Sequence, residues 1–110
     1  MDIVSDIVSD GGSDAHVLVL HGAFDVRSTW EVRNAIYECI DVLDEDVVID
    51  MTDVSTIDVT ALRLLAVATR HAWLAGHHLT VRNPAPAVRR MAHLARLAHA
   101  LEVERVAATA

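Results

Sequence analysis

The chain has 110 residues, of which 53% are hydrophobic and 23% charged, and its formal net charge is −7 at pH 7. This length and composition predict one folded domain, residues 1–110, and exclude a disordered chain. No uncharged stretch approaches the roughly 20 apolar residues that cross a bilayer. The acidic N-terminus also lacks the basic and then apolar order of a signal peptide. We therefore expect a cytoplasmic protein with no membrane partner.

Charge is unevenly distributed along the sequence. Residues 1–58 hold fourteen acidic residues and two arginines, whereas residues 59–110 hold two acidic residues and seven arginines. The one local basic group, Arg89, Arg90 and Arg96, is explained by the exposed face of a helix. Because neutralisation of phosphates supplies most of the affinity for nucleic acids, we expect no direct nucleic-acid binding.

Two strands are predicted first, over 3–8 and 16–20, with a turn rich in Gly and Asp at 10–14 between them. Ser28 and Glu31 have the spacing of a capping box, in which each side chain bonds the backbone amide of the other residue. Apolar residues at helical spacing follow, so a helix is predicted over 29–43. Cys39 lies on its apolar face, and we expect this single cysteine to be buried rather than reactive.

A strand is predicted over 46–51, followed by a polar loop over 51–59 and a helix over 60–75, with Trp73 on its apolar stripe. A short strand over 79–81, a helix over 86–98 and a last strand over 101–106 complete the order, and the final residues 107–110 are expected to fray. This alternation predicts an α/β fold with a mostly parallel sheet and crossover helices.

Two predicted loops, 22–27 and 51–59, follow strands that end at the same edge of such a sheet. Asp25 and Asp58 are therefore expected to lie close to Thr60. From the residues alone, Asp58 could simply be the N-cap of the helix, with the Thr60 hydroxyl bonded to a free backbone amide. A functional hydroxyl flanked by two carboxylates is the alternative.

Three segments, HVLVLHGAFD, VVIDMTDVSTIDVTALRLL and LTVRNPAPAVRRMAHLARLAHALEV, together resemble the STAS domain of bacterial anti-anti-sigma factors over nearly the whole chain. The resemblance implies a STAS-type fold: a four- to five-stranded mixed sheet, mostly parallel, with three or four helices. It also implies an anti-sigma factor antagonist that is not an enzyme. Such a protein binds an anti-sigma factor that is a serine/threonine kinase, frees a sigma factor for transcription, and is switched off when that kinase phosphorylates it.

The family's central motif, Asp-Ser-Ser/Thr-Gly-Leu, corresponds here to Asp58-Val59-Thr60-Ala61-Leu62. The resemblance therefore implies that Thr60 is the phosphorylated residue. It implies that partner contacts come from Asp25, which ends a Gly-Glu-Leu-Asp-like turn, and from Asp58, Val59, Ala61 and Arg63. Val59 and Ala61 depart from the family's serine and glycine, and the Ala61 methyl group could crowd an approaching kinase.

Two other functions stay open. The first is a phospho-independent STAS interaction module, such as a scaffold of a sensory complex or a subunit of a lipid-transport assembly, which Val59 and Ala61 favour. The second is a small-ligand or nucleotide binder at the ends of the strands, against which the lack of a phosphate-cradling glycine loop argues.

No metal site or cofactor is expected, because no two of the seven histidines have the three- or four-residue spacing of ligands on one helical face. No enzyme motif occurs, and the aspartates and threonine lack a general base. The oligomeric state is left open.

Overall fold

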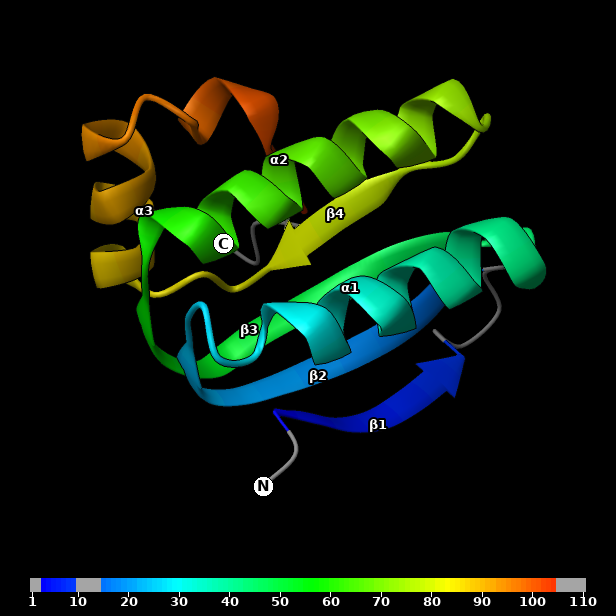
Figure 1. Ribbon diagram of the computed structural model, residues 1–110, viewed down its shortest axis with the longest axis horizontal. Helices are drawn as coiled ribbons and strands as arrows, with labels where there is room; N and C mark the ends of the chain where they lie inside the picture. Colours follow the sequence, from blue (N-terminus) through cyan, green and yellow to red (C-terminus); the bar gives the residue numbers. More distant parts are fainter. Residues whose placement is uncertain (1–2, 10–14, 105–110) are drawn as a thin grey trace, which may run out of the picture.

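The computed structural model describes residues 3–9 and 15–104, which form a five-stranded sheet covered by helices (Figure 1). The elements in chain order are β1 (Val4–Ser9), β2 (Ala15–Phe24), α1 (Thr29–Tyr37), the π-helical turn η1 (Glu38–Val42), β3 (Asp46–Ile57), α2 (Val59–Leu74), β4 (Leu79–Arg82), α3 (Pro86–Leu94), the 3₁₀ turn η2 (Ala98–Ala100) and β5 (Glu102–Val103). The predicted turn at 10–14, the fraying of 107–110 and any strand beyond 104 lie outside the described residues.

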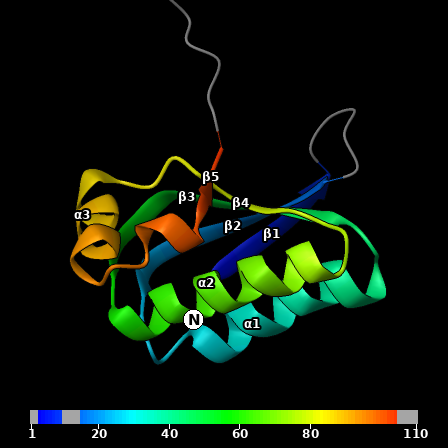
Figure 2. The ribbon, with the colours of Figure 1, turned by 90° about the horizontal axis from the view of Figure 1, so that it is seen from above.

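The sheet has the order β1-β2-β3-β4-β5. β1 is antiparallel to β2, and the other neighbours are parallel. α1 and α2 lie side by side on one face of the sheet, and α3 stands at the end where β2 and β3 finish (Figures 1 and 2). This confirms the predicted α/β fold with a mixed, mostly parallel sheet. Within the described residues, no helix is both long enough and apolar enough to span a bilayer.

The core lies between the sheet and the helices. Its fully buried side chains come mainly from β2, β3, α1 and α2, and include Leu18, Leu20, Ile49, Met51, Val32, Ile36, Leu62 and Leu65. Cys39 belongs to the same cluster, so its predicted burial is confirmed. Burial raises the pKa of the Cys39 thiol to about 11, and the thiol is therefore protonated at neutral pH.

The predicted capping box at the start of α1 is wrong. Ser28 has a helical backbone conformation, and its hydroxyl accepts from the Asp25 N–H at 3.2 Å and donates to the Asp25 carbonyl at 3.1 Å. The Glu31 carboxylate instead accepts from the Val4 N–H at 3.0 Å. Glu31 therefore ties α1 to β1, a partner 27 residues away that local spacing cannot reveal.

Two helix predictions also need correction. Trp73, expected on the apolar stripe of α2, is exposed, because the buried stripe runs through Leu65, Ala68 and Ala72 and leaves position 73 at its margin. α3 ends at Leu94 instead of residue 98, since Arg96 adopts a φ of 59° and its N–H donates to the His93 carbonyl. The Leu97 N–H donates to the Ala92 carbonyl at 2.9 Å, which completes a Schellman motif.

His77 precedes β4 at the end of the sheet opposite α3 (Figure 1), and it makes the stability of the fold depend on pH. Nε2 of His77 lies 2.7 Å from Asp44 Oδ1, and its Nδ1 lies 3.0 Å from Asp46 Oδ1. Hydrogen bonds to Asp44 and then Asp46 raise the pKa of His77 above its ordinary 6.5. The protonated ring is bonded on both nitrogens only in the folded state, so this stabilisation is complete below pH 6.5 and is lost as pH rises through the raised pKa.

We therefore expect the parent to have a higher free energy of unfolding than His77→Gln, and the difference to be largest in mild acid. The difference should shrink as pH rises above about 6.5. Urea titrations at a series of pH values measure it. Asp44→Asn, which removes the stronger hydrogen-bond partner, is the companion variant and should flatten the dependence. A difference that grows with pH would contradict this arrangement.

Candidate functional site

β2 and β3 continue further than the sequence indicates and end together at one edge of the sheet. Their last residues, Phe24 and Ile57, are paired in register. The predicted loops are thus wrong over residues 22–24 and 52–57, which are strand. The next residue on each strand is an aspartate, Asp25 or Asp58, so the register itself places the two acids at the same edge.

Bulges explain why these strand ends read as loops. The register of β2 and β3 shifts between Val19 and His21 and again after Gly22, which adopts a φ of 74°. Each shift places an extra residue on β3, so its buried side chains recur every third residue, at Met51, Val54 and Ile57. Polar residues fill the gaps, and the period-two alternation expected of a strand is lost.

Asp58 joins the two strand ends and starts α2. Its N–H donates to the Phe24 carbonyl at 3.3 Å. One carboxylate oxygen accepts from the Ala61 N–H at 2.8 Å, and the other accepts from the Val26 N–H at 3.0 Å. The role of Asp58 as N-cap is confirmed, and the same carboxylate also fixes the loop that follows β2.

Asp25 is neutralised by a residue to which the sequence analysis gave no role. Arg27 binds the Asp25 carboxylate through Nε at 3.1 Å and Nη2 at 2.7 Å, and its backbone N–H donates to it at 3.0 Å. These bonds lower the pKa of Asp25. The Arg27 side chain is 80% exposed and that of Asp25 only 22%, so the surface presents a guanidinium more than a carboxylate. In the sequence, this ion pair was indicated only by the two-residue spacing of Asp25 and Arg27, which is one of two arginines in residues 1–58.

The remaining site residues lie in the first turns of α2. Thr60 and Arg63 are exposed, and Val59 is 37% exposed. Ala61 is 0% exposed, because position 61 begins the stripe of α2 that packs on the sheet. Its side chain therefore offers no surface to a partner and does not crowd Thr60 from outside, which corrects both expectations for Ala61.

The edge can bind another macromolecule or present a hydroxyl to an enzyme. It combines the exposed Thr60, the Arg27 guanidinium and a shallow hollow of about 480 Å³ whose lining includes Arg27, His21 and Ser28. Over residues 3–9 and 15–104, no group of three or more His, Cys, Asp or Glu side chains is placed to hold a metal ion.

The fold and this edge define a small α/β domain in which an exposed residue with a hydroxyl group, Thr60, lies in the first turn of α2, directly after the central strand β3. The chain belongs to the STAS domain family, since the family model described as "Mlab, STAS domain" matches residues 8–104. No sequence among the curated proteins compared with it matches this chain.

Solved structures with the same fold include anti-sigma factor antagonists. A candidate antagonist from Thermotoga maritima matches with a TM-score of 0.76 and 13% identity, over 92% of this chain and 86% of that one. The antagonist SpoIIAA matches in its unphosphorylated form with a TM-score of 0.70 and 14% identity, over 93% and 88%. The Bacillus SpoIIAA in its phosphorylated form matches with a TM-score of 0.67 and 16% identity, over 91% of this chain and 90% of that one. The TM-scores establish the shared fold, and at such low sequence identities the comparison shows the fold alone.

Proposed function

We propose that this protein is an anti-sigma factor antagonist that acts by partner switching in the cytoplasm. In this proposal the unphosphorylated protein binds an anti-sigma factor kinase through the loop 25–28, Asp58 and the exposed Val59, Thr60 and Arg63. Phosphorylation of Thr60 ends that binding. The exposure of Thr60 at the second position of α2, on a helix start that Asp58 locks to the neighbouring loop, is the observation that carries the proposal. Family membership supports it.

Electrostatics favour a switch that acts at the surface. A phosphate on Thr60 would add about −1.5 to −2 charges. The positive end of the α2 dipole attracts it by only about 0.3–1 kcal/mol. A carboxylate about 6 Å away repels each unit of charge by roughly 3 kcal/mol at an effective dielectric near 20. Asp58 supplies such a charge, whereas the pairing with Arg27 reduces the contribution of Asp25. The phosphate therefore stays in solvent and makes the edge more anionic without refolding.

The test combines phosphorylation with binding. Incubation with the cognate kinase and ATP should place phosphate on Thr60, and Thr60→Glu should bind the kinase about tenfold more weakly or worse, a loss of about 1.4 kcal/mol. Thr56→Glu is the matched control, because Thr56 is an exposed threonine four residues earlier, and it should remain within about twofold of the parent. Phosphate found on another residue, or parental affinity of Thr60→Glu, would overturn the proposal.

A phospho-independent STAS interaction module is the second candidate. The partly exposed Val59 favours it, because this residue places an apolar side chain beside Thr60 where the antagonists resembled have serine. In that case the module would be a scaffold of a sensory complex or a subunit of a lipid-transport assembly. Identical partners captured by the parent, Thr60→Ala and Thr60→Glu would decide for this candidate.

A further inference from the structure

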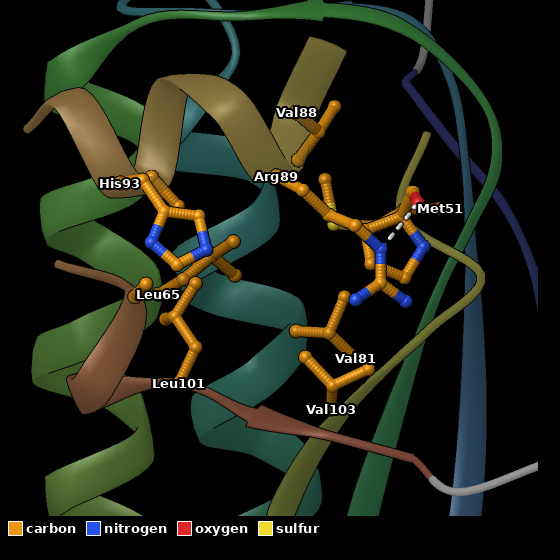
Figure 3. Close-up of a pocket in the computed structure, with 11 residues that line it drawn as sticks. Met51, Leu65, Val81, Val88, Arg89, His93, Leu101 and Val103 are labelled. Carbon is orange, nitrogen blue, oxygen red and sulfur yellow. Dashed lines mark hydrogen bonds between the residues drawn. The ribbon is translucent and has the colours of Figure 1, made fainter. Parts of the chain in front are cut away.

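An apolar cavity of about 190 Å³ lies between α2, α3 and the β4–β5 side of the sheet (Figure 3). Most of its walls are hydrocarbon, and its lining residues are Met51, Leu65, Val81, Pro84, Val88, Arg89, Ala92, His93, Ala98, Leu101 and Val103. They come from β3, α2, β4, α3, η2 and β5, so the cavity exists only in the folded chain. It is separate from the edge that holds Thr60.

The cavity is partly open to solvent, and it is more enclosed than the larger hollow of about 480 Å³ beside Arg27. An apolar cavity offers water few hydrogen bonds, and one of about 150 Å³ stays dry and takes up benzene. By that measure, 190 Å³ accommodates an alkyl chain of about six to eight carbons.

Two arginines lie at or beside the opening: Arg89 lines the cavity, and Arg96 lines a hollow that adjoins it. A second hollow of about 420 Å³, lined by His93, Arg96, Ala98 and His99, adjoins the cavity and shares His93 and Ala98 with it. Nε of Arg89 donates to the Pro84 carbonyl at 3.3 Å, which holds the guanidinium toward the cavity (Figure 3). Among the described residues that line the two hollows there is no Asp or Glu, although the chain carries a net charge of −7.

Helix electrostatics account for only one of the two arginines. A positive charge is favourable near the C-terminal end of a helix, which is sufficient to explain Arg96, two residues beyond the end of α3. Arg89 is the fourth residue of α3, in the first turn, where a positive charge opposes the helix dipole. Its hydrogen bond to the Pro84 carbonyl holds it there, and its positive charge faces the cavity with no Asp or Glu among the residues that line it.

We propose that this cavity binds a free alkyl carboxylate of about eight carbons. The hydrocarbon chain fills the space between Leu65, Val88 and Leu101, and the carboxylate meets Arg89 at the opening, with Arg96 in the adjoining hollow. Octanoate is the probe, and the experiment is an amide NMR titration of the full chain. We expect saturable shifts at Val81, Val88 and Leu101, and binding of butanoate roughly two hundredfold weaker, because it buries four fewer methylene groups.

Variants separate the cavity from its charged mouth. Ala92→Leu fills the cavity and should weaken octanoate binding roughly tenfold, with Ala98→Leu at the rim as the second filling variant if the first does not fold. Arg89→Gln should weaken octanoate about threefold to fivefold and leave binding of neutral 1-octanol unchanged. Arg90→Gln, an exposed position on the same helix that lines neither hollow, should match the parent.

Three outcomes would overturn the proposal. They are no saturation by octanoate at millimolar concentrations, parental affinity in both filling variants, and binding only to anionic lipid vesicles. The last outcome would make this face a membrane contact. Because none of these variants touches Thr60, the kinase assay above remains an independent test of the proposed function.

Discussion

Replacing Phe24 with alanine is expected to lower the free energy of unfolding by about 4 kcal/mol. Phe24 is the last residue of β2, and its fully buried ring belongs to the core between the sheet and the helices. Truncation removes the buried apolar surface and leaves a cavity that the surrounding side chains fill only in part. Equilibrium unfolding in urea, followed by circular dichroism, measures the loss. A domain of this size has roughly 5–15 kcal/mol to lose, so the variant should still fold.

The same substitution should loosen the candidate site. The Phe24 carbonyl accepts the Asp58 N–H, so a mobile end of β2 weakens the attachment of α2 to the sheet. Hydrogen exchange of the Asp58 amide should therefore accelerate in Phe24→Ala by more than its global stability explains. Val26→Ala is the control: Val26 lies two residues further on, is exposed, and should change stability by less than about 0.5 kcal/mol. A loss below about 1 kcal/mol in Phe24→Ala would contradict the packing of this strand end.

Sequence reasoning succeeded where the chemistry is local. An aspartate immediately before an apolar helical pattern satisfies first-turn amides through its own side chain, and Asp58 does so. The start of α2, within one residue of its predicted position, and the burial of Cys39 follow from patterns within single helical segments. The order of the elements and the sheet class also follow from short-range patterns.

Sequence reasoning failed where the deciding contact is distant. The polar residues between Met51 and Ile57 suggest a loop until the bulges opposite Gly22 are known. Glu31 fits a capping box, but the Val4 amide competes for its carboxylate. Neither partner can be located without the fold.

The arginines in and after α3 are exposed, as the sequence predicts for Arg89, Arg90 and Arg96. The prediction of one shared helix face is wrong for Arg96, because α3 ends at Leu94 in a Schellman turn. Arg89 lines the cavity, Arg96 lines the adjoining hollow, and Arg90 lines neither. Only the tertiary arrangement separates the three positions.

Asp58→Ala is expected to lower the free energy of unfolding by about 2 kcal/mol, because the variant loses an N-cap bond and a second bond to another segment. The Asp58 carboxylate accepts from Ala61 at the start of α2 and from Val26 in the loop after β2. Both amides should exchange hydrogen faster in the variant, and urea unfolding measures the total loss. If the Asp58 carboxylate capped only α2, the substitution would accelerate hydrogen exchange at the Ala61 amide and not at the Val26 amide.

Two variants sharpen this result. Asp58→Asn keeps one side-chain oxygen as an acceptor and should lose roughly half as much stability as Asp58→Ala. Asp53→Ala removes an exposed aspartate from β3, the strand that precedes Asp58, and should stay within about 0.5 kcal/mol of the parent, with normal exchange at Val26 and Ala61. If Asp58→Ala left the Val26 amide protected, the loop 25–28 would be held independently of α2. The two halves of the proposed partner surface would then not be rigidly joined, and Thr60 could change its environment without moving the loop beside it.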